Sequence, residues 1–116
     1  MEKSELEQKL RKIFIRFFNE QMGQFPASIT IMFRATICAV KVEKALPLAE
    51  AQMIQNDIAY EMLKRYKNRQ FDIAIPIIKK ELKSIAICEP LSIDFSMGKD
   101  NVQYLIINFP KVFYVE

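Results

Sequence analysis

The sequence contains no histidine and only two glycines in 116 residues. Without histidine the chain cannot form Ser-His-Asp or Cys-His machinery, and it lacks the commonest ligand of transition metals. Two glycines cannot supply a G-x-G-x-x-G loop or a P-loop, so the common nucleotide-binding fingerprints are excluded. Carboxylates remain as acid–base candidates, but no two of them form a convincing catalytic pair on one element. We therefore expect a protein that is not an enzyme and that binds no cofactor or metal.

Cysteine and long apolar runs are also scarce. The two cysteines, Cys38 and Cys88, lie in apolar surroundings, and we expect both to be buried, reduced thiols. The longest stretch without a charge runs from Gln21 to Phe33, which is too short for a membrane-spanning helix. The N-terminus has no apolar segment of the signal-peptide kind. These features predict a cytoplasmic protein that reaches a membrane only from its surface.

The first twenty residues have the pattern of an amphipathic helix. Its apolar positions recur at helical spacing: Leu6, Leu10, Ile13, Phe14, Phe17 and Phe18. Ser4 and Glu7 fit the spacing of a capping box, and Gly23 followed by Pro26 predicts the end of the helix.

Basic residues form a stripe on another face of this helix. Lys9, Lys12 and Arg16 could contact phosphate or lipid headgroups of an anionic partner. Glu5 and Glu20 stand four residues away from two of them, which is the pattern of a solvated, self-paired face. We favour the solvated face.

A second basic segment covers residues 64–69, where Lys64 and Lys67 could also meet an anionic partner. The aromatic residue between them, Tyr66, has the phase of an apolar arc and is predicted to lie in the core. The net charge of +3 is small for a nucleic-acid-binding domain, so we do not expect nucleic acid as a partner.

Alternating apolar residues predict two hairpins. The first joins a strand over 28–33 to a strand over 36–42 through a turn at Arg34 and Ala35. The second joins strands over 91–96 and 102–109 through the turn-forming residues 97–101.

The region between the hairpins is predicted to be helical from Pro47 onward. Its first apolar arc comprises Ala51, Ile54, Ile58, Met62 and Tyr66. Its second arc comprises Phe71, Ala74, Ile78, Leu82 and Ile85. At about 100° per residue the two arcs point in nearly opposite directions on a straight helix.

Two explanations for this conflict stay open. The chain could break near Asn68, or one continuous helix, kinked at Pro76, could bury each end against a different partner. Ile73 and Ile77 fall outside the second arc, and we predict that they form a self-association surface in a homodimer.

The pattern as a whole predicts a single domain over residues 1–116. Its fold class is α+β, a two-layer sandwich of order α-β-β-α-β-β around a four-stranded, mainly antiparallel sheet. The long second helical segment is expected to be kinked or broken.

The order of elements and several short motifs resemble the MpsC-like family, a component of the sodium-translocating, membrane-potential-generating system and long a domain of unknown function. The matching segments are Gly23-Gln-Phe-Pro-Ala-Ser28, Leu46-Pro-Leu-Ala-Glu50, Ile75-Pro76 with Ile77–Leu82, Asp94 within Ser92–Phe95, and Leu105–Phe109. The chain departs from the family pattern at Phe25, Ala27, Ala35-Thr36 and Ile75. The resemblance implies a link to ion-coupled energetics or inorganic-carbon uptake, and it implies no catalytic residue.

Three functions remain open at this point. We favour a non-enzymatic interaction or regulatory module, homodimeric and accessory to such a membrane system, with a membrane-system or other protein as partner. The first alternative is a nucleic-acid-binding regulatory protein that uses the basic segment 64–69. The second is an enzyme or small-ligand-binding domain with a pocket between the sheet and the helices.

Overall fold

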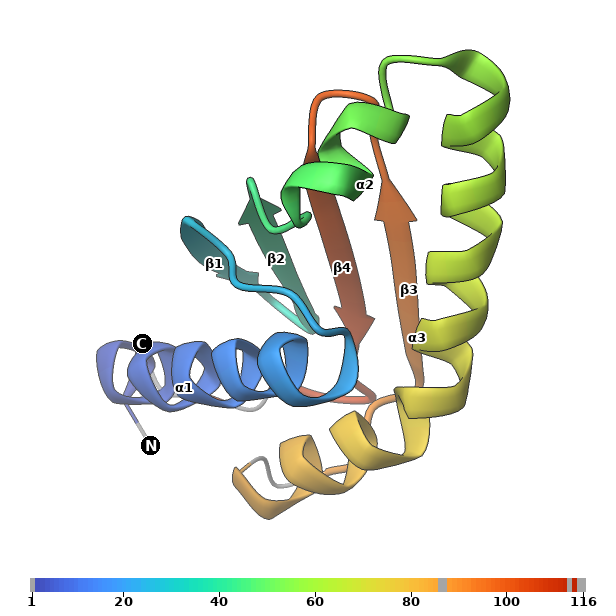
Figure 1. Cartoon of the computed structure of the whole chain (residues 1–116). Coiled ribbons are helices and arrows are strands. Elements are labelled where there is room, and N and C mark those ends of the chain that lie inside the picture. Colours follow the sequence, from blue (N-terminus) through green and yellow to red (C-terminus); the bar gives the residue numbers. More distant parts are fainter. Residues whose placement is uncertain (1, 86–87, 113, 115–116) are drawn as a thin grey trace.

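The computed structural model describes residues 2–85, 88–112 and 114 of the chain (Figure 1). Its elements follow one another as α1 (Lys3–Gln21), β1 (Ser28–Arg34), β2 (Ile37–Glu43), α2 (Leu48–Met53), α3 (Asp57–Ile85), β3 (Ser92–Met97) and β4 (Val102–Asn108). The predicted α+β class and the order of helix, hairpin, helical region and hairpin are confirmed.

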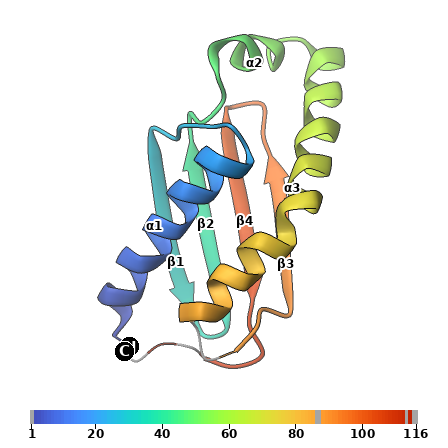
Figure 2. The ribbon, with the colours of Figure 1, turned by 60° about the horizontal axis from the view of Figure 1, so that its bottom comes forward.

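The four strands form one antiparallel sheet with the order β1-β2-β4-β3. Each hairpin contributes one central strand, so β2 pairs with β4 and Val40 stands opposite Leu105. Figure 2 shows α1 and the second half of α3 side by side across the same face of the sheet. The helices and the sheet therefore make the two predicted layers.

Helix α1 buries the predicted apolar face, because all six of its predicted core residues are buried. The predicted capping box is wrong. The helix begins at Lys3, before Ser4, and Glu2 at its N-cap makes no side-chain capping bond. The backbone N–H of Leu6 already donates to the carbonyl of Glu2 at 3.0 Å, so Ser4 and Glu7 lie inside the helix.

The predicted end of α1 is confirmed. Gly23 adopts a positive φ of 62°, the left-handed conformation that glycine reaches without a steric cost. The chain then reverses, and the N–H of Gln24 donates to the carbonyl of Phe18 at 2.9 Å.

The turn of the first hairpin lies one residue later than predicted. Arg34 pairs with Ile37, so the two-residue turn is Ala35-Thr36 rather than Arg34-Ala35. Ala35 takes a φ of 53°, which hairpin turns of this length demand at one or both central positions. The burial phase of both strands is as predicted, because Phe33 and Cys38 still face each other on the covered side.

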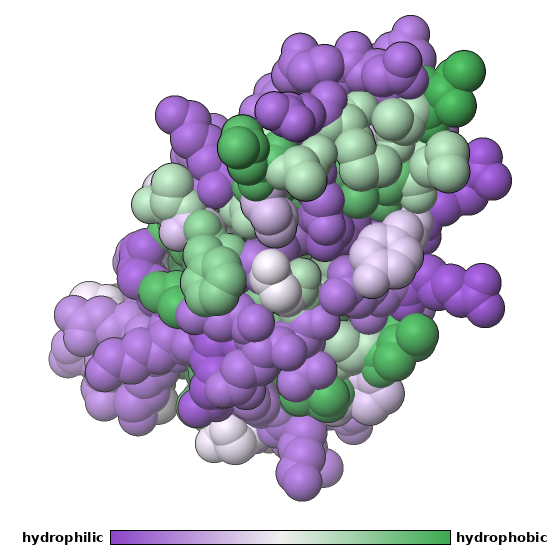
Figure 3. All heavy atoms as spheres, in the orientation of Figure 1, coloured by the Kyte–Doolittle hydropathy of each residue, from purple (hydrophilic) through white to green (hydrophobic). Residues whose placement is uncertain are grey.

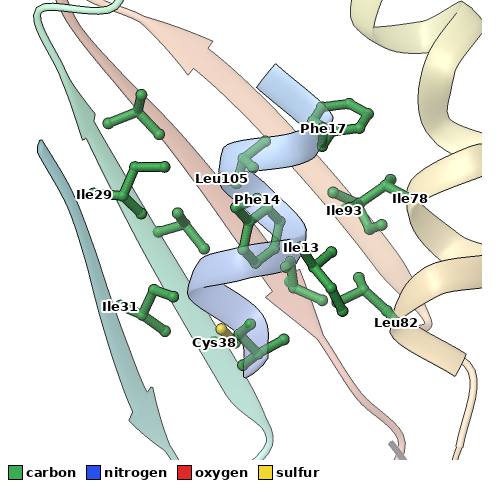
Figure 4. Packing of buried hydrophobic residues seen from close by; sticks show 14 of the residues in the cluster. Ile13, Phe14, Phe17, Ile29, Ile31, Cys38, Ile78, Leu82, Ile93 and Leu105 are labelled. Carbon is green, nitrogen blue, oxygen red and sulfur yellow. The ribbon is translucent and has the colours of Figure 1, made fainter. Parts of the chain in front are cut away.

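The main hydrophobic core lies between the sheet and the two long helices (Figure 4). Phe14 and Phe17 point from α1 toward the strands, and Ile78 and Leu82 approach from α3. At about 25 cal/mol per Å² of apolar surface removed from water, this cluster supplies the main driving force of folding.

The helical region breaks between α2 and α3, not near Asn68. Asn56 occupies the break, and its Oδ1 accepts a hydrogen bond of 3.0 Å from the N–H of Ala59, as an N-cap does. Helix α3 then continues through Asn68 to Ile85 with Pro76 inside it, and Figure 1 shows the bend in this part of the helix. Proline removes one helical hydrogen bond, which accounts for the predicted kink.

A second, smaller core lies under α2 and the first half of α3. It comprises Leu46, Ile54, Tyr60, Leu63 and Met97. The hydroxyl of Tyr60 donates to the carbonyl of Met97 at 2.6 Å and fixes α3 to the end of β3. The two ends of α3 therefore pack against different clusters.

Candidate interaction surface

Helix α3 carries an apolar face that is interrupted by Arg69 and Gln70 and that no other described element covers. This outward face comprises Ile58, Met62, Tyr66, Ile73 and Ile77, with exposed fractions between 42% and 76%. In Figure 3, hydrophobic atoms gather at the front over α2 and the first half of α3, and again near the bend of α3. Exposed apolar residues gathered on one helix face mark an interaction site more often than an isolated exposed residue does.

The outward face resolves the phase conflict in the sequence, and it corrects one prediction. The first arc divides: Ile54 lies in the smaller core, whereas Ile58, Met62 and Tyr66, which were expected in the core, are exposed. At about 100° per residue they share one side of the helix with Ile73 and Ile77. The buried side of α3 instead carries Tyr60, Leu63, Lys67, Phe71, Ala74, Ile78 and Leu82.

Two hollows lie along the outward face. The smaller, of about 180 Å³, is lined by Tyr66, Arg69, Gln70 and Ile73. The larger, of about 600 Å³, lies at the bend and is lined by Pro76, Ile77, Lys80, Glu81 and Ser84. Both hollows are open to solvent and lie on α3 itself. Of the two predicted association residues, Ile73 lines the smaller hollow and Ile77 lines the larger one.

The face of the sheet that points away from α1 and α3 is a second apolar surface. Met32 is 52% exposed there, and Ile37, Tyr104 and Ile106 are less exposed. Thr30, Lys41 and Asp94 interrupt this surface with polar groups. It is therefore more mixed in polarity than the outward face of α3.

The basic stripe of α1 is largely engaged in ion pairs. Lys9 Nζ lies 3.8 Å from Glu5 Oε1, as the spacing predicts. Arg16 pairs with Glu81 of α3, and this hydrogen bond and charge raise the pKa of the Arg16 guanidinium. Lys12 is exposed. The basic stripe is therefore a solvated, ion-paired face, as favoured above. Its Arg16 also links α1 to α3.

The two lysines singled out in the second basic segment differ in burial: Lys64 is partly exposed and Lys67 is buried. Lys64 lies with its Nζ 5.9 Å from the ring centre of Tyr60. Lys67 is only 2% exposed, and its Nζ lies 2.8 Å from Glu50 Oε1. An external anion would therefore meet Lys64, whereas Lys67 joins α3 to α2 inside the protein.

The ion pair of Glu50 with Lys67 escaped the sequence analysis, although a signal was present. Lys67 stands four residues after Leu63 and four before Phe71, which is the phase of the buried side. Glu50 belongs to the Leu46–Glu50 motif at the start of α2. A buried lysine needs a partner, because an unpaired ammonium inside a protein is strongly unfavourable.

A buried amide pair connects the segment after α1 to the sheet. Gln103 Nε2 donates to Gln24 Oε1 at 2.9 Å, and both side chains are fully buried. Gln103 stands opposite Met97 and Val42 in the sheet, at the level of the smaller core. The pair holds the segment after α1 against β4.

Cys38 lacks the features of a reactive thiol. Both cysteines are free thiols; Cys38 is buried and Cys88 is partly buried. Burial raises the pKa of the Cys38 thiol to about 12, so this thiol stays protonated at neutral pH. Among the residues that the structure describes, no three Cys, Asp or Glu side chains gather closely enough to hold a metal ion.

Within residues 2–85, 88–112 and 114, no helix combines the length and the apolar composition that crossing a bilayer requires. No curated protein and no solved structure shows significant similarity to the chain. The model of one protein family, described as the Na+-translocating membrane potential-generating system (MpsC), matches residues 2–107. This match covers nearly the whole chain and confirms the resemblance found in its motifs. The chain therefore belongs to the MpsC family.

Proposed function

We propose that the protein is a non-enzymatic interaction or regulatory module that works as a cytoplasmic homodimer beside an ion- or inorganic-carbon-linked membrane system. Membership of the MpsC family supports an association with a Na+-translocating system. The observation that carries the proposal is the outward face of α3, which runs from Ile58 to Ile77.

The shape of this surface supports protein as its partner. A helix face of about five turns is long enough for a second helix to lie along it. Its residues are large and apolar, and they leave a hollow on each side of Ile73. A second copy of the chain would cover this surface with the same surface, as in a twofold dimer.

Replacing Ile73 and Ile77 together by lysine should convert the dimer to a monomer. Both side chains point outward, so the double variant should keep the circular dichroism spectrum and thermal midpoint of a folded domain. Burying two lysines in an apolar interface would be strongly unfavourable. Sedimentation equilibrium measures the result directly, with the 13.6 kDa mass of one chain as reference.

Leu91→Lys is the matched control, because Leu91 is 68% exposed and lies outside α3. This variant should remain dimeric. A wild-type protein that sediments at the mass of one chain at tens of micromolar concentration would contradict the proposed dimer.

The exposed lysines of α1 favour one further candidate, a peripheral contact with anionic lipid. Lys9 and Lys12 lie on the outside of α1, and each lysine near an anionic surface contributes about 1 kcal/mol. Changing both to glutamate should weaken binding to phosphatidylserine vesicles at least about 30-fold at low salt. Arg16 is kept because it pairs with Glu81. Vesicle co-sedimentation tests this, and equal binding by wild type and variant would exclude α1 as the lipid contact.

A further inference from the structure

The spacing of apolar and charged residues along α3 indicates how a second copy would be oriented against its outward face. Resting on the homodimer proposed above, we propose that two copies pack α3 against α3 in antiparallel orientation, with the twofold axis between Arg69 and Gln70. Tyr66 of each copy then contacts Ile73 of the other.

The apolar residues are spaced symmetrically about this axis. Tyr66 lies as far before it as Ile73 lies after it, and Met62 and Ile77 are also equidistant from it. A twofold axis exchanges the two ends of an antiparallel helix pair, so each residue meets its equidistant counterpart. Met62 of one copy thus packs against Ile77 of the other, and the apolar contact covers both flanks of the axis.

The smaller hollow fits the same register. The residues that line it, Tyr66, Arg69, Gln70 and Ile73, are centred on the proposed axis. This part of α3 lies before Pro76, so the contact about the axis uses the helix ahead of its bend.

Charged residues on one flank of the outward face favour the antiparallel orientation. Glu61, Arg65, Asp72 and Lys79 lie on that flank at about 100° per residue. Antiparallel packing brings Glu61 toward Lys79 of the other copy and Arg65 toward its Asp72, so opposite charges meet in both cases. Arg69 comes closest to the axis, and Asp72, three residues on, offsets the two like charges that meet there.

Site-specific cross-linking tests this register in the full chain. Single cysteines are introduced by Arg69→Cys, Met62→Cys or Ile77→Cys in a Cys88→Ser background, and the buried Cys38 is retained. A short thiol-to-thiol cross-linker should join Arg69→Cys chains to each other, because that position lies beside the axis. Two Met62→Cys chains should not react with each other, since positions 62 and 77 are about 22 Å apart along one helix. A mixture of Met62→Cys and Ile77→Cys chains should cross-link.

The cross-linking and sedimentation results together distinguish the antiparallel dimer from a parallel dimer, a dimer through another surface and a monomer. Self-cross-linking of Met62→Cys would show a parallel pair and overturn the proposed register. If sedimentation gives a dimer but none of the variants cross-links, the dimer uses another surface; the register is then wrong and the homodimer stands. If sedimentation gives a monomer, both the register and the proposed homodimer fail.

Discussion

Replacing Phe71 by alanine should destabilise the protein by about 4 kcal/mol, the range observed when a buried aromatic side chain is truncated. Phe71 is 2% exposed and lies where α1, α3 and β3 meet. Its ring stands edge-on to Phe17 at 5.9 Å and stacks on Phe95 at 5.0 Å. The truncation removes both ring contacts and leaves a cavity. Urea unfolding followed by circular dichroism measures the loss.

Phe25→Ala is the matched control, because it makes the same truncation at a side chain that is 74% exposed. Its free energy of unfolding should change by no more than about 0.5 kcal/mol. Equal losses in the two variants would contradict the assignment of Phe71 to the core.

Phe95 explains why the effect of Phe71 should reach beyond the main core. Phe95 is partly buried and packs against both hydrophobic clusters. Its stacking on Phe71 therefore connects the second half of α3 to the smaller core under α2. A cavity at Phe71 would weaken the contact between the two clusters as well as the larger cluster itself.

Periodicity predicted the elements that bury one face against a single core. In α1 and in the first two strands, the alternation of apolar and polar residues reports directly on which side faces the core. Element ends were less predictable, because they depend on single hydrogen bonds. The turn at Ala35-Thr36 and the start of α1 at Lys3 each differ from the prediction by one or a few residues.

The first half of α3 shows where periodicity fails. Ile58, Met62 and Tyr66 form a regular apolar arc, and this arc faces outward. Sequence alone cannot distinguish an apolar face that meets the protein's own core from one that is free for a partner. The buried side of α3 was hard to recognise in the sequence, because the lysine at position 67 interrupts its apolar pattern.

The candidate surface was predictable in part. Ile73 and Ile77 were selected because they did not fit the buried arc, and the structure places both on the surface. The outward face is longer than predicted, since it also includes Ile58, Met62 and Tyr66, which were expected in the core. The break at Asn56 could have been found from its position before Asp57, because Asn and Asp favour the first positions of a helix.

Replacing Glu50 by alanine should destabilise the protein by about 3 kcal/mol, because the change leaves the ammonium of Lys67 buried without its carboxylate. Losses for breaking a buried ion pair run to about 5 kcal/mol, and the lower end applies because Glu50 keeps 27% of its side-chain exposure. Ala51 and Met53 of α2 pack against the smaller core, and the ion pair adds a polar contact between α2 and α3. Thermal unfolding measures the effect.

Adding Lys67→Met to Glu50→Ala should restore most of the lost stability, because methionine fills the space of the lysine stem and carries no charge to desolvate. Glu5→Ala serves as the matched control. It breaks the exposed pair with Lys9, which contributes less than about 1 kcal/mol. If Glu50→Ala cost no more than Glu5→Ala, the buried pair would contribute no more than an exposed one. A recovery with Lys67→Met would show that the cost of Glu50→Ala comes from the unpaired charge, whereas no recovery would assign that cost to the lost contacts of Glu50 and contradict this account.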